Sequence, residues 1–532
     1  MHSVLRFVVG IIALVLPLMA TADIINVPGD QPTIQAGIDA AINGDTVLVA
    51  DGTYTGDGNR DMDFGGKAIT VKSENGPTNC IIDCGGSEVE NHRAFYFHTS
   101  EGHDSVVDGF TITNGYAYWG GAILCDMPPF QPGANPTITN CIIYGNVSVD
   151  DGGAIEGHYS APRVINNRIE GNTAGMSGGG INYGGSLTGG DMPIVANNVI
   201  INNQAASSAG GIAHYTEDWG ERGALIINNI IAGNTSGHGG GGILCSNGAS
   251  TTIIGNSIVN NSSGRGGGIE YKGNSIVTVE NTILWGNHVS GDGAEVYIHN
   301  REGFATFSIS YSDLSGGLSS VYVDSESTLN WGAGMIETDP LFITGPAGDF
   351  YLSQIAAGQG EDSPCLDAGN DLAQNICFSV PNGSFCMNHL TTRTDQVTDT
   401  GQVDMGCHFN LMPVSSNLAC TPDTGTLPFT TQVCVSMNNI IDFHRTFAGR
   451  MDLTLSSGTY FSNWRVGYTN MSPYENYMMC WNQQLPALGS LLGENLLELK
   501  VQDVTSAPYN QPPYPPAGDT DSAACTVIGL VQ

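Results

Sequence analysis

The stretch Ile227-Asn228-Asn229-Ile230-Ile231-Ala232-Gly233-Asn234 decides the fold, because variants of it recur along the chain. Between Pro136 and Ile298, a block of Asn flanked by apolar residues appears six times. The final asparagines of these blocks are separated by 26, 31, 31, 27 and 26 residues, and they are Asn146, Asn172, Asn203, Asn234, Asn261 and Asn287. Each block is followed by a glycine cluster and then by Ile or Val. A fixed period of this length indicates a solenoid, a propeller or another repeat array.

The content of one repeat separates these architectures. Each period holds two short β-branched runs separated by Gly and Asn, and no segment has the spacing and length of a helix. We therefore expect two or three short strands in each coil. A propeller blade needs about 40 residues and four strands. We therefore expect an all-β right-handed parallel β-helix, in which each strand pairs with its equivalent about 4.8 Å away on the next coil. Disorder is the alternative for a chain rich in Gly and Asn, and the regular Ile and Val residues argue against it.

The Gly and Asn residues have two expected roles in such a solenoid. Sharp corners between sheets need left-handed backbone, which these two residues tolerate best. Equivalent asparagines on successive coils can also hydrogen-bond to one another, and we expect them to form an internal ladder.

The alternation of Gly-Gly-Ala-Ile (152–155) or Gly-Gly-Gly-Ile (178–181) with Asn-x-Ile-x-x-Asn resembles the repeat of polymorphic outer membrane proteins and of the wider pectin-lyase-like β-helix group. The resemblance covers residues 24–410. Gly44-Asp45-Thr46-Val47 and Asp404-Met405-Gly406-Cys407 resemble the opening and closing turns of secreted and surface β-helix proteins. The resemblance implies the fold, but that fold hosts lyases, hydrolases, epimerases and adhesins and does not by itself choose a function.

Composition divides the 532-residue chain into three parts. Residues 1–22 have the features of a signal peptide, with Arg6 near the start, an apolar core and the small residues Ala20-Thr21-Ala22. The apolar core is too short to span a membrane and is interrupted by Pro17, and we expect no span later in the chain. We therefore expect export, to the medium or the cell surface, with a β-helix over residues 23–410 and a second domain over residues 411–532.

The two ends of the chain differ from the repeats. Pro32 to Ala41 has apolar residues at helical spacing, and we expect an amphipathic helix that caps the open end of the solenoid. Residues 370–402 are expected to form an insertion loop. In residues 411–532 the long period stops, and alternating strands with short turns favour an antiparallel β-sandwich loosely similar to immunoglobulin-like modules.

The chain is strongly acidic, with 51 Asp and Glu residues, 16 Lys and Arg residues and a formal net charge of −35. This charge repels nucleic acids and anionic membranes, and it favours cations and neutral or cationic partners. A polyanionic substrate would need a local basic patch or a bound metal ion. We expect a monomer with a polysaccharide or a cell-surface glycan as its partner and no nucleic acid.

Thirteen cysteines in an exported chain indicate disulfides. Cys80 and Cys84 are close enough in sequence to pair, and so are Cys377 and Cys386. Cys125 and Cys245 occupy equivalent repeat positions and point inward by strand alternation, so we expect buried free thiols. The last domain contains four cysteines whose pairing the spacing leaves open, namely Cys420, Cys434, Cys480 and Cys525.

The strand after each glycine cluster carries the candidate site. If its Ile points inward, the next residue and the one two further on point outward. The first outward column is Leu124, Glu156, Asn182, Ala213, Leu244, Glu270 and Tyr297. The second outward column is Asp126, His158, Gly184, Tyr215, Ser246, Lys272 and His299. The two columns place carboxylate, imidazole, phenol and ammonium groups in one strip, which could bind an extended glycan.

Two functions fit this strip. The first is non-catalytic adhesion or glycan binding, with ligand contacts from Glu156, Asn182, Glu270, Tyr297 and His299. The second is a polysaccharide lyase, which needs a base and a cation beside the carboxylate of a uronic acid. The lyase candidates are Lys272 and Arg265, helped by His158 or Tyr215. We favour the first function because catalytic groups are few and the chain is acidic.

A hydrolase fits less well than either function. It needs two carboxylates about 5–9.5 Å apart, whereas Glu156 and Glu270 lie four coils apart, about 19 Å by strand spacing. No metal site is assigned, since the sequence lacks Cys/His zinc spacing. Calcium is the one cofactor left open, because Asp150-Asp151 and Asp292 lie in glycine-rich turns and could bind it. Aspartates in turns are more often simple turn formers.

Overall fold

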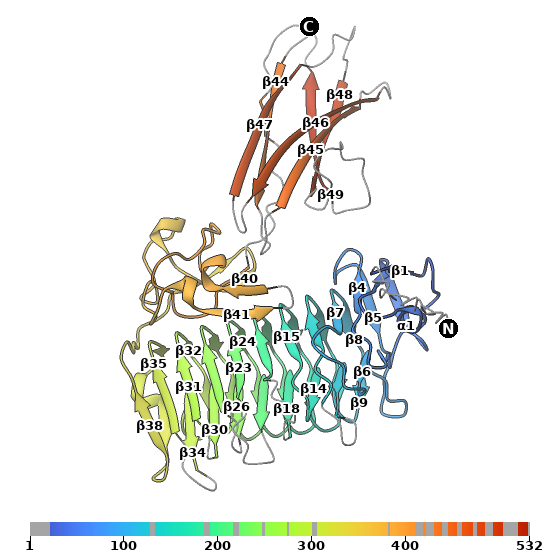
Figure 1. Ribbon diagram of the computed structural model, residues 1–532. Helices are drawn as coiled ribbons and strands as arrows, with labels where there is room; N and C mark the ends of the chain where they lie inside the picture. Colours follow the sequence, from blue (N-terminus) through green and yellow to red (C-terminus); the bar gives the residue numbers. More distant parts are fainter. Residues whose placement is uncertain are drawn as a thin grey trace, which may run out of the picture.

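The computed structural model describes most of the chain from residue 22 to residue 410 (Figure 1). The described ranges are 22–127, 133–185, 192–215, 223–246, 250–273, 276–300, 306–380 and 383–410, with only the backbone described at 379–380 and 383–384. Beyond them, the backbone of seven strands is described between residues 419 and 529. The expected signal peptide, apart from its last residue, lies outside the described residues.

Residues 24–331 contain a parallel β-solenoid of about nine turns, which confirms the expected repeat architecture (Figure 1). One turn passes through four strands in a fixed order, for example β11 (Thr137–Thr139), β12 (Ile142–Tyr144), β13 (Val147–Ser148) and β14 (Ile155–His158). The chain then enters β15 (Arg163–Ile165), which pairs in parallel with β11. The expected two or three strands per coil were too few, because a two-residue strand such as β13 follows the second corner.

Stacked equivalent strands form four parallel sheets, here called sheets A, B, C and D. Besides β11 and β15, sheet A contains β1 (Ile24–Val27), β2 (Thr46–Val49), β4 (Thr70–Ser73), β7 (Val106–Asp108), β19 (Ile194–Ala196), β23 (Ala224–Ile227), β27 (Thr251–Ile254), β31 (Ile276–Glu280), β35 (Thr306–Ser310) and β38 (Thr328–Trp331). Besides β12, sheet B contains β3 (Gly52–Thr55), β5 (Cys80–Asp83), β8 (Thr111–Thr113), β16 (Arg168–Glu170), β20 (Val199–Ile201), β24 (Ile230–Ala232), β28 (Ser257–Val259), β32 (Ile283–Trp285) and β36 (Asp313–Leu314).

Sheets C and D complete the solenoid. Besides β14, sheet C contains β6 (Phe95–Phe97), β10 (Ile123–Cys125), β18 (Ile181–Gly184), β22 (Ile212–Tyr215), β26 (Ile243–Ser246), β30 (Ile269–Lys272), β34 (Val296–His299) and β37 (Val321–Val323). Besides β13, sheet D contains β9 (Tyr116–Ala117), β17 (Thr173–Ala174), β21 (Gln204–Ala205), β25 (Thr235–Ser236), β29 (Ser262–Ser263) and β33 (His288–Val289). A 3-10 helix, η1 (Gly317–Ser320), precedes β37.

Inward-facing Ile and Val fill the solenoid. Ile155, Ile181 and Ile212, the first residues of three successive sheet C strands, are fully buried in one continuous core cluster. Burial of an Ile side chain stabilises the folded state by about 1.5–3 kcal/mol. Stacking each Ile over its equivalent on the next coil therefore holds the strands in register.

The corners confirm the expected role of Gly and Asn. In six successive coils, the corner between sheets A and B has one residue with a positive φ between 51° and 61°, and these residues are Asn140, Asn166, Asn197, Asn228, Gly255 and Asn281. At the corner between sheets B and D the φ values are 55° to 67°, and the residues are Gly145, Gly171, Asn202, Gly233, Asn260 and Gly286. Other side chains pay a steric penalty in this left-handed region.

Two buried asparagine ladders run along the inside of these corners, as expected. Beside the A–B corner lie Asn167, Asn198, Asn229 and Asn256, and beside the B–D corner lie Asn146, Asn172, Asn203, Asn234, Asn261 and Asn287. Asn203 shows the pattern: its Oδ1 accepts from Asn172 N at 3.0 Å, and its Nδ2 donates to Asn234 Oδ1 at 3.0 Å and to Ile169 O at 2.9 Å. The ladders satisfy backbone groups that the corners leave unpaired.

The amphipathic helix is present as α1 (Ile34–Ala40). The Thr33 side chain caps its first turn by accepting from Ala36 N at 3.2 Å. Ile34 and Ile38 are buried, and α1 lies beside β1 and β2. Gly37 permits this close approach, because a Cβ there would lie 2.7 Å from Val47 Cγ1.

The segment after the last coil, residues 339–410, is here called the fold-back segment. It contains the antiparallel pairs β39 (Phe342–Gly345) with β40 (Gly348–Leu352) and β41 (Cys377–Val380) with β42 (Gly383–Cys386), and the 3-10 helices η2 (Ile355–Ala357), η3 (Ala373–Asn375) and η4 (Met387–His389). It lies along the A–B corner (Figure 1). Asn228 hydrogen-bonds both the N–H and the carbonyl of His408, each at 2.7 Å. The region expected to be an insertion loop, residues 370–402, is thus a folded part of this segment.

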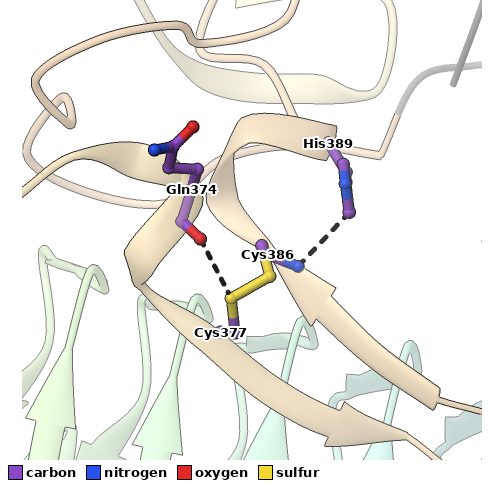
Figure 2. Close-up of a disulfide and its surroundings, with 4 residues drawn as sticks. All are labelled: Gln374, Cys377, Cys386 and His389. Atoms are coloured by element: carbon purple, nitrogen blue, oxygen red, sulfur yellow. Dashed lines mark hydrogen bonds between the residues drawn. A yellow bond between two sulfur atoms is a disulfide. The ribbon is translucent and has the colours of Figure 1, made fainter.

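The cysteines follow two of the three expectations that the described residues test. Cys377 and Cys386 form a disulfide across β41 and β42 (Figure 2). Cys125 and Cys245 are buried free thiols, as expected. The expected Cys80–Cys84 pair is wrong, since both are buried free thiols. Four residues of extended strand separate their Cα atoms by about 13 Å, beyond the roughly 7 Å that a disulfide can bridge.

The strands after residue 418 pair only in antiparallel fashion, in contrast to the solenoid. They are β43 (Ala419–Thr421), β44 (Thr430–Asn438), β45 (Arg445–Thr454), β46 (Tyr460–Met471), β47 (Asn476–Gln484), β48 (Gly493–Asp503) and β49 (Thr520–Gly529). Their backbone forms one sheet ordered β43-β44-β47 and another ordered β46-β45-β48-β49. The expected sandwich packing and the four cysteines of this region involve side chains outside the described residues.

Candidate functional site

The register of sheet C reproduces the first predicted column in full and most of the second. Leu124 pairs with Glu156, Glu156 with Asn182 and Asn182 with Ala213, and the column continues through Leu244 and Glu270 to Tyr297. In the second column Tyr215 pairs with Ser246, Ser246 with Lys272 and Lys272 with His299. Ala213 and Leu244 form a cluster separate from the main core, which shows that the first column faces away from the interior.

The expectation that the first column is exposed is wrong for most of its members. Glu156 is 1% exposed, and Asn182 and Glu270 are 0% exposed. The glycine turn before each strand covers the column residue: a Cβ at Gly152 would lie 2.8 Å from Glu156 Cβ, and one at Gly178 would lie 2.7 Å from Asn182 Cβ. The glycines therefore bring the turn backbone down onto these side chains. Tyr297, at the far end of the column, is only half-buried.

One group of polar residues lies around β14. Asn182 Nδ2 donates to Glu156 Oε1 at 3.0 Å. Asp151 Oδ1 accepts from Ser177 N at 2.8 Å, and the Tyr215 hydroxyl donates to Asp151 Oδ2 at 3.4 Å. Burial raises the pKa of Glu156 well above its usual range, and the neighbouring Asp151 charge adds to the shift. Burial also raises the pKa of Asp151 to about 6.

A half-exposed pair adjoins this group. His158 Nδ1 lies 2.9 Å from Asp126 Oδ1, and the His158 ring stacks on Trp119 with centroids 5.0 Å apart. Trp119 Nε1 donates to Asp150 Oδ2 at 3.1 Å. Burial opposes ionisation of Asp126, but the hydrogen bond from His158 holds its pKa below the usual range.

A second group lies around β30 and β34. Arg265 Nε donates to the buried Glu270 Oε1 at 2.8 Å, and His299 Nε2 lies 3.0 Å from the same oxygen. Arg265 also lies over the Tyr297 ring, 5.4 Å from its centroid, and Tyr297 stacks on Tyr322 at 4.4 Å. Burial opposes ionisation of Glu270, but the His299 hydrogen bond and the Arg265 and Lys272 charges hold its pKa below the usual range.

The four lyase candidates do not meet in one place. Lys272 and Arg265 both act on Glu270, whereas Tyr215 contacts Asp151. His158 lies on β14, four strand steps from Lys272 on β30, which is about 19 Å by strand spacing. A base and a cation on the same sugar unit must be adjacent. Of the five ligand-binding candidates, Tyr297 and His299 are half-buried, and Glu156, Asn182 and Glu270 lie beneath the turns.

The sequence reasoning missed a row of residues in the glycine turns, here called the turn row. Successive turn glycines, and Ala209 in one coil, donate to the backbone carbonyls of Asp151, Ser177, Ser208, Gly239, Arg265 and Asp292. These residues precede the positive-φ position of each turn, so aligning the glycine clusters would have revealed the row. It places Asp151 beside Glu156 and Arg265 beside Glu270.

It also missed a buried group in the fold-back segment. One ligand atom from each of Asp399, Asp404 and His408 lies within 4.8 Å of the others, so the group could in principle hold a metal ion. His408 Nε2 lies 2.8 Å from Asp399 Oδ2, and Asp404 accepts from Asp367 N at 2.7 Å and Thr392 Oγ1 at 2.5 Å. These protein hydrogen bonds account for the group as a structural network. No local sequence signal marks it, because its members meet only in the folded segment.

The chain matches no protein-family model, and no curated protein is similar to it at a significant level. Within the described residues, none of the helices is both long and apolar enough to cross a membrane.

Proposed function

We propose that this chain is an exported β-helix protein, secreted or at the cell surface, whose sheet C face binds an extended uncharged glycan without cleaving it. The observation that carries the proposal is a pair of aromatic platforms on that face. One is Trp119 stacked on His158, and the other is Tyr297 stacked on Tyr322. They lie about 24 Å apart, five strand steps from β14 to β34.

Aromatic rings with partly exposed faces and adjacent polar groups suit sugar rings, which have an apolar face and a hydroxyl rim. All four platform residues are half-buried, so each keeps some ring surface accessible. Polar side chains that can hydrogen-bond hydroxyls, Tyr215 and Lys272 among them, lie between the platforms. The face therefore offers two stacking positions joined by a polar strip.

Charge favours an uncharged ligand over a uronic acid polymer. The Arg265 cation is already hydrogen-bonded to the buried Glu270, and Asp126, Asp150 and Asp151 lie near the other platform. A net charge of −35 adds long-range repulsion of polyanions. Binding without cleavage fits the separation of the candidate catalytic groups.

The handedness of the solenoid, its cap, the signal peptide and the C-terminal module are part of the same proposal. The repeat resembles the pectin-lyase-like and polymorphic outer membrane protein groups, which implies a right-handed solenoid with α1 as its cap. The signal peptide over residues 1–22 implies export, and residues 411–532 would form an immunoglobulin-like module. N-terminal sequencing of protein collected from the medium or cell surface tests export, with Asp23 as the expected first residue.

A glycan array and a polymer-degradation assay on one preparation test the binding function. Trp119→Ala and Tyr297→Ala should each weaken glycan binding by about 0.5–1.5 kcal/mol, roughly 2- to 10-fold in Kd, because each removes one stacking surface. Tyr144→Ala is the matched control, since Tyr144 is 45% exposed on sheet B, away from the proposed face.

Equal losses in all three variants, or no binding to any glycan, would contradict the proposal. Unsaturated sugar ends released from a uronic acid polymer, and lost in Lys272→Ala, would instead establish the lyase alternative.

A further inference from the structure

We propose that Asp151, Glu156 and Asn182 form a calcium site beneath the glycine turn before β14. The proposal is independent of glycan binding, and it does not depend on the aromatic platforms.

The geometry begins with two oxygen atoms. Asn182 Nδ2 donates to Glu156 Oε1 at 3.0 Å, which assigns the orientation of the amide. Glu156 Oε2 and Asn182 Oδ1 are buried, and neither has a hydrogen-bond partner among the described residues. A Cβ at Gly152 would lie 2.8 Å from Glu156 Oε2, so this oxygen lies against the turn that carries Asp151. Buried polar atoms are normally paired, and two unpaired oxygens on hydrogen-bonded neighbours indicate a missing positive partner. Glu270 Oε2, farther along sheet C, also lacks a hydrogen-bond partner, but the other oxygen of that carboxylate accepts from Arg265.

The repeat supplies an internal comparison. Glu270 occupies the same column as Glu156, four strands along sheet C, and it is equally buried. In its coil the turn row supplies Arg265, whose Nε donates to Glu270 at 2.8 Å. In the coil of Glu156 the equivalent turn residue is Asp151, a second acid. One buried glutamate thus has a cation built into the chain, and the other has a second acid at the equivalent turn position, whose charge raises its pKa.

The electrostatics of the two coils differ accordingly. The charges of Asp151, Asp150 and Asp126 all add to the burial that raises the pKa of Glu156. Glu270, beside His299, Arg265 and Lys272, has a lowered pKa. A buried carboxylate persists in its charged form only when a cation compensates it. A cation bound at Asp151 and Glu156 would compensate the buried carboxylate of Glu156, as Arg265 compensates that of Glu270.

The donor set selects the ion. Two carboxylates and an amide carbonyl are hard oxygen ligands, which suit calcium or magnesium and not zinc or copper. Calcium accepts six to eight oxygens in an irregular arrangement, whereas magnesium demands a near-ideal octahedron. Side chains fixed on a turn and two neighbouring strands cannot readily adjust to an octahedron. Backbone carbonyls and water would supply the remaining ligands.

The test uses the full chain, freed of metal with a chelator, and follows thermal unfolding and calorimetric titration with CaCl₂ and MgCl₂. Calcium should raise the Tm by several degrees with half-saturation near about 10⁻⁴–10⁻³ M, the range of extracellular sites, and magnesium should act more weakly. Glu156→Gln and Asp151→Asn should each reduce calcium affinity at least 10-fold. Asp292→Asn is the control, because Asp292 holds the equivalent turn position in a coil whose column residue is Tyr297 and not a glutamate. This variant should leave the calcium affinity unchanged.

A second variant tests the comparison between coils. Asp151→Arg should reproduce the Arg265–Glu270 pair, abolish the calcium response and give a calcium-free Tm equal to or above that of the parent. A parent protein that does not respond to calcium would overturn the proposal. So would a response that survives in both Glu156→Gln and Asp151→Asn, or one that falls equally in Asp292→Asn.

Discussion

At the scale of the residue, the ladder asparagines pack inside the solenoid and also hydrogen-bond buried backbone groups of neighbouring coils. From Asn146 to Asn261, each Asn amide in the ladder beside sheet D accepts from the preceding coil and donates to the next Asn of the ladder. Asn203, for example, satisfies the Asn172 N–H and the Ile169 carbonyl. All these groups are buried, so water cannot replace the amide if it is removed.

Asn203→Ala should therefore lower the free energy of unfolding by roughly 2–4 kcal/mol, because it leaves a buried donor and a buried acceptor unpaired. Urea denaturation followed by circular dichroism measures the loss. The neighbouring Asn202→Gly is the control. Asn202 is exposed, and glycine holds the equivalent left-handed position in four other coils, so its stability should stay within about 0.5 kcal/mol of the parent. Similar losses in both variants would contradict the ladder's role.

At the scale of the element, corner asparagines also dock the fold-back segment. Asn228 has positive φ at the A–B corner, and its side chain pairs with both backbone groups of His408. Asn197 donates to Asn410 Oδ1 at 2.9 Å, and Asn281 and Asn370 hydrogen-bond to each other. Residues that turn the chain thus also hold a segment that lies far away in sequence.

Asn228→Gly should keep the corner and release the segment, because glycine adopts the same φ but has no amide. We expect faster hydrogen exchange at the His408 amide and faster proteolysis within residues 339–410, measured by mass spectrometry. Asn140→Gly is the control, since Asn140 has the same backbone conformation and donates to Asp108. Unchanged exchange at His408 in Asn228→Gly would show that other contacts hold the segment.

At the scale of the whole molecule, buried acids make stability depend on pH. Burial raises the pKa of Glu295 to about 7 and that of Asp313 to about 7. Burial opposes protonation of His408, but its hydrogen bond to Asp399 raises its pKa. Between pH 6.5 and 8 the folded chain therefore binds more protons than the unfolded chain, and its stability falls as pH rises. Burial lowers the pKa of His214 to about 4, and its opposite effect falls mainly between pH 4 and 6.5, with only a small part above pH 6.5.

We expect the free energy of unfolding to fall by roughly 1–2 kcal/mol between pH 6.5 and 8, measured by urea denaturation at each pH in the presence of chelator. Glu295→Gln should reduce the difference, because it removes one of the carboxyl groups that take up a proton in the folded state. A stability that rises over this range, or an undiminished difference in Glu295→Gln, would contradict this account.

The solenoid, its corners and its ladders could be predicted from the amino-acid sequence alone. These features are local and periodic: left-handed corners are held mostly by Gly or Asn, and inward positions mostly by Ile or Val, in successive coils. The register of sheet C followed from the same period, so both columns could be placed from the glycine clusters. The Cys377–Cys386 disulfide and α1 were also predictable, because each depends on residues close in sequence.

The accessibility of the outward residues and the pairing of their charges became visible only in the folded chain. Glu156, Asn182 and Glu270 point away from the core, yet glycine turns lie over them and bury them. Strand alternation predicts the direction of a side chain but not whether a turn covers it. The pairing of Arg265 with Glu270, the meeting of Asp151 with Glu156 and the docking of His408 on Asn228 join residues from different turns, strands and segments. Periodicity specifies the direction of a side chain, whereas its burial and its electrostatic partners depend on backbone that returns from elsewhere in the chain.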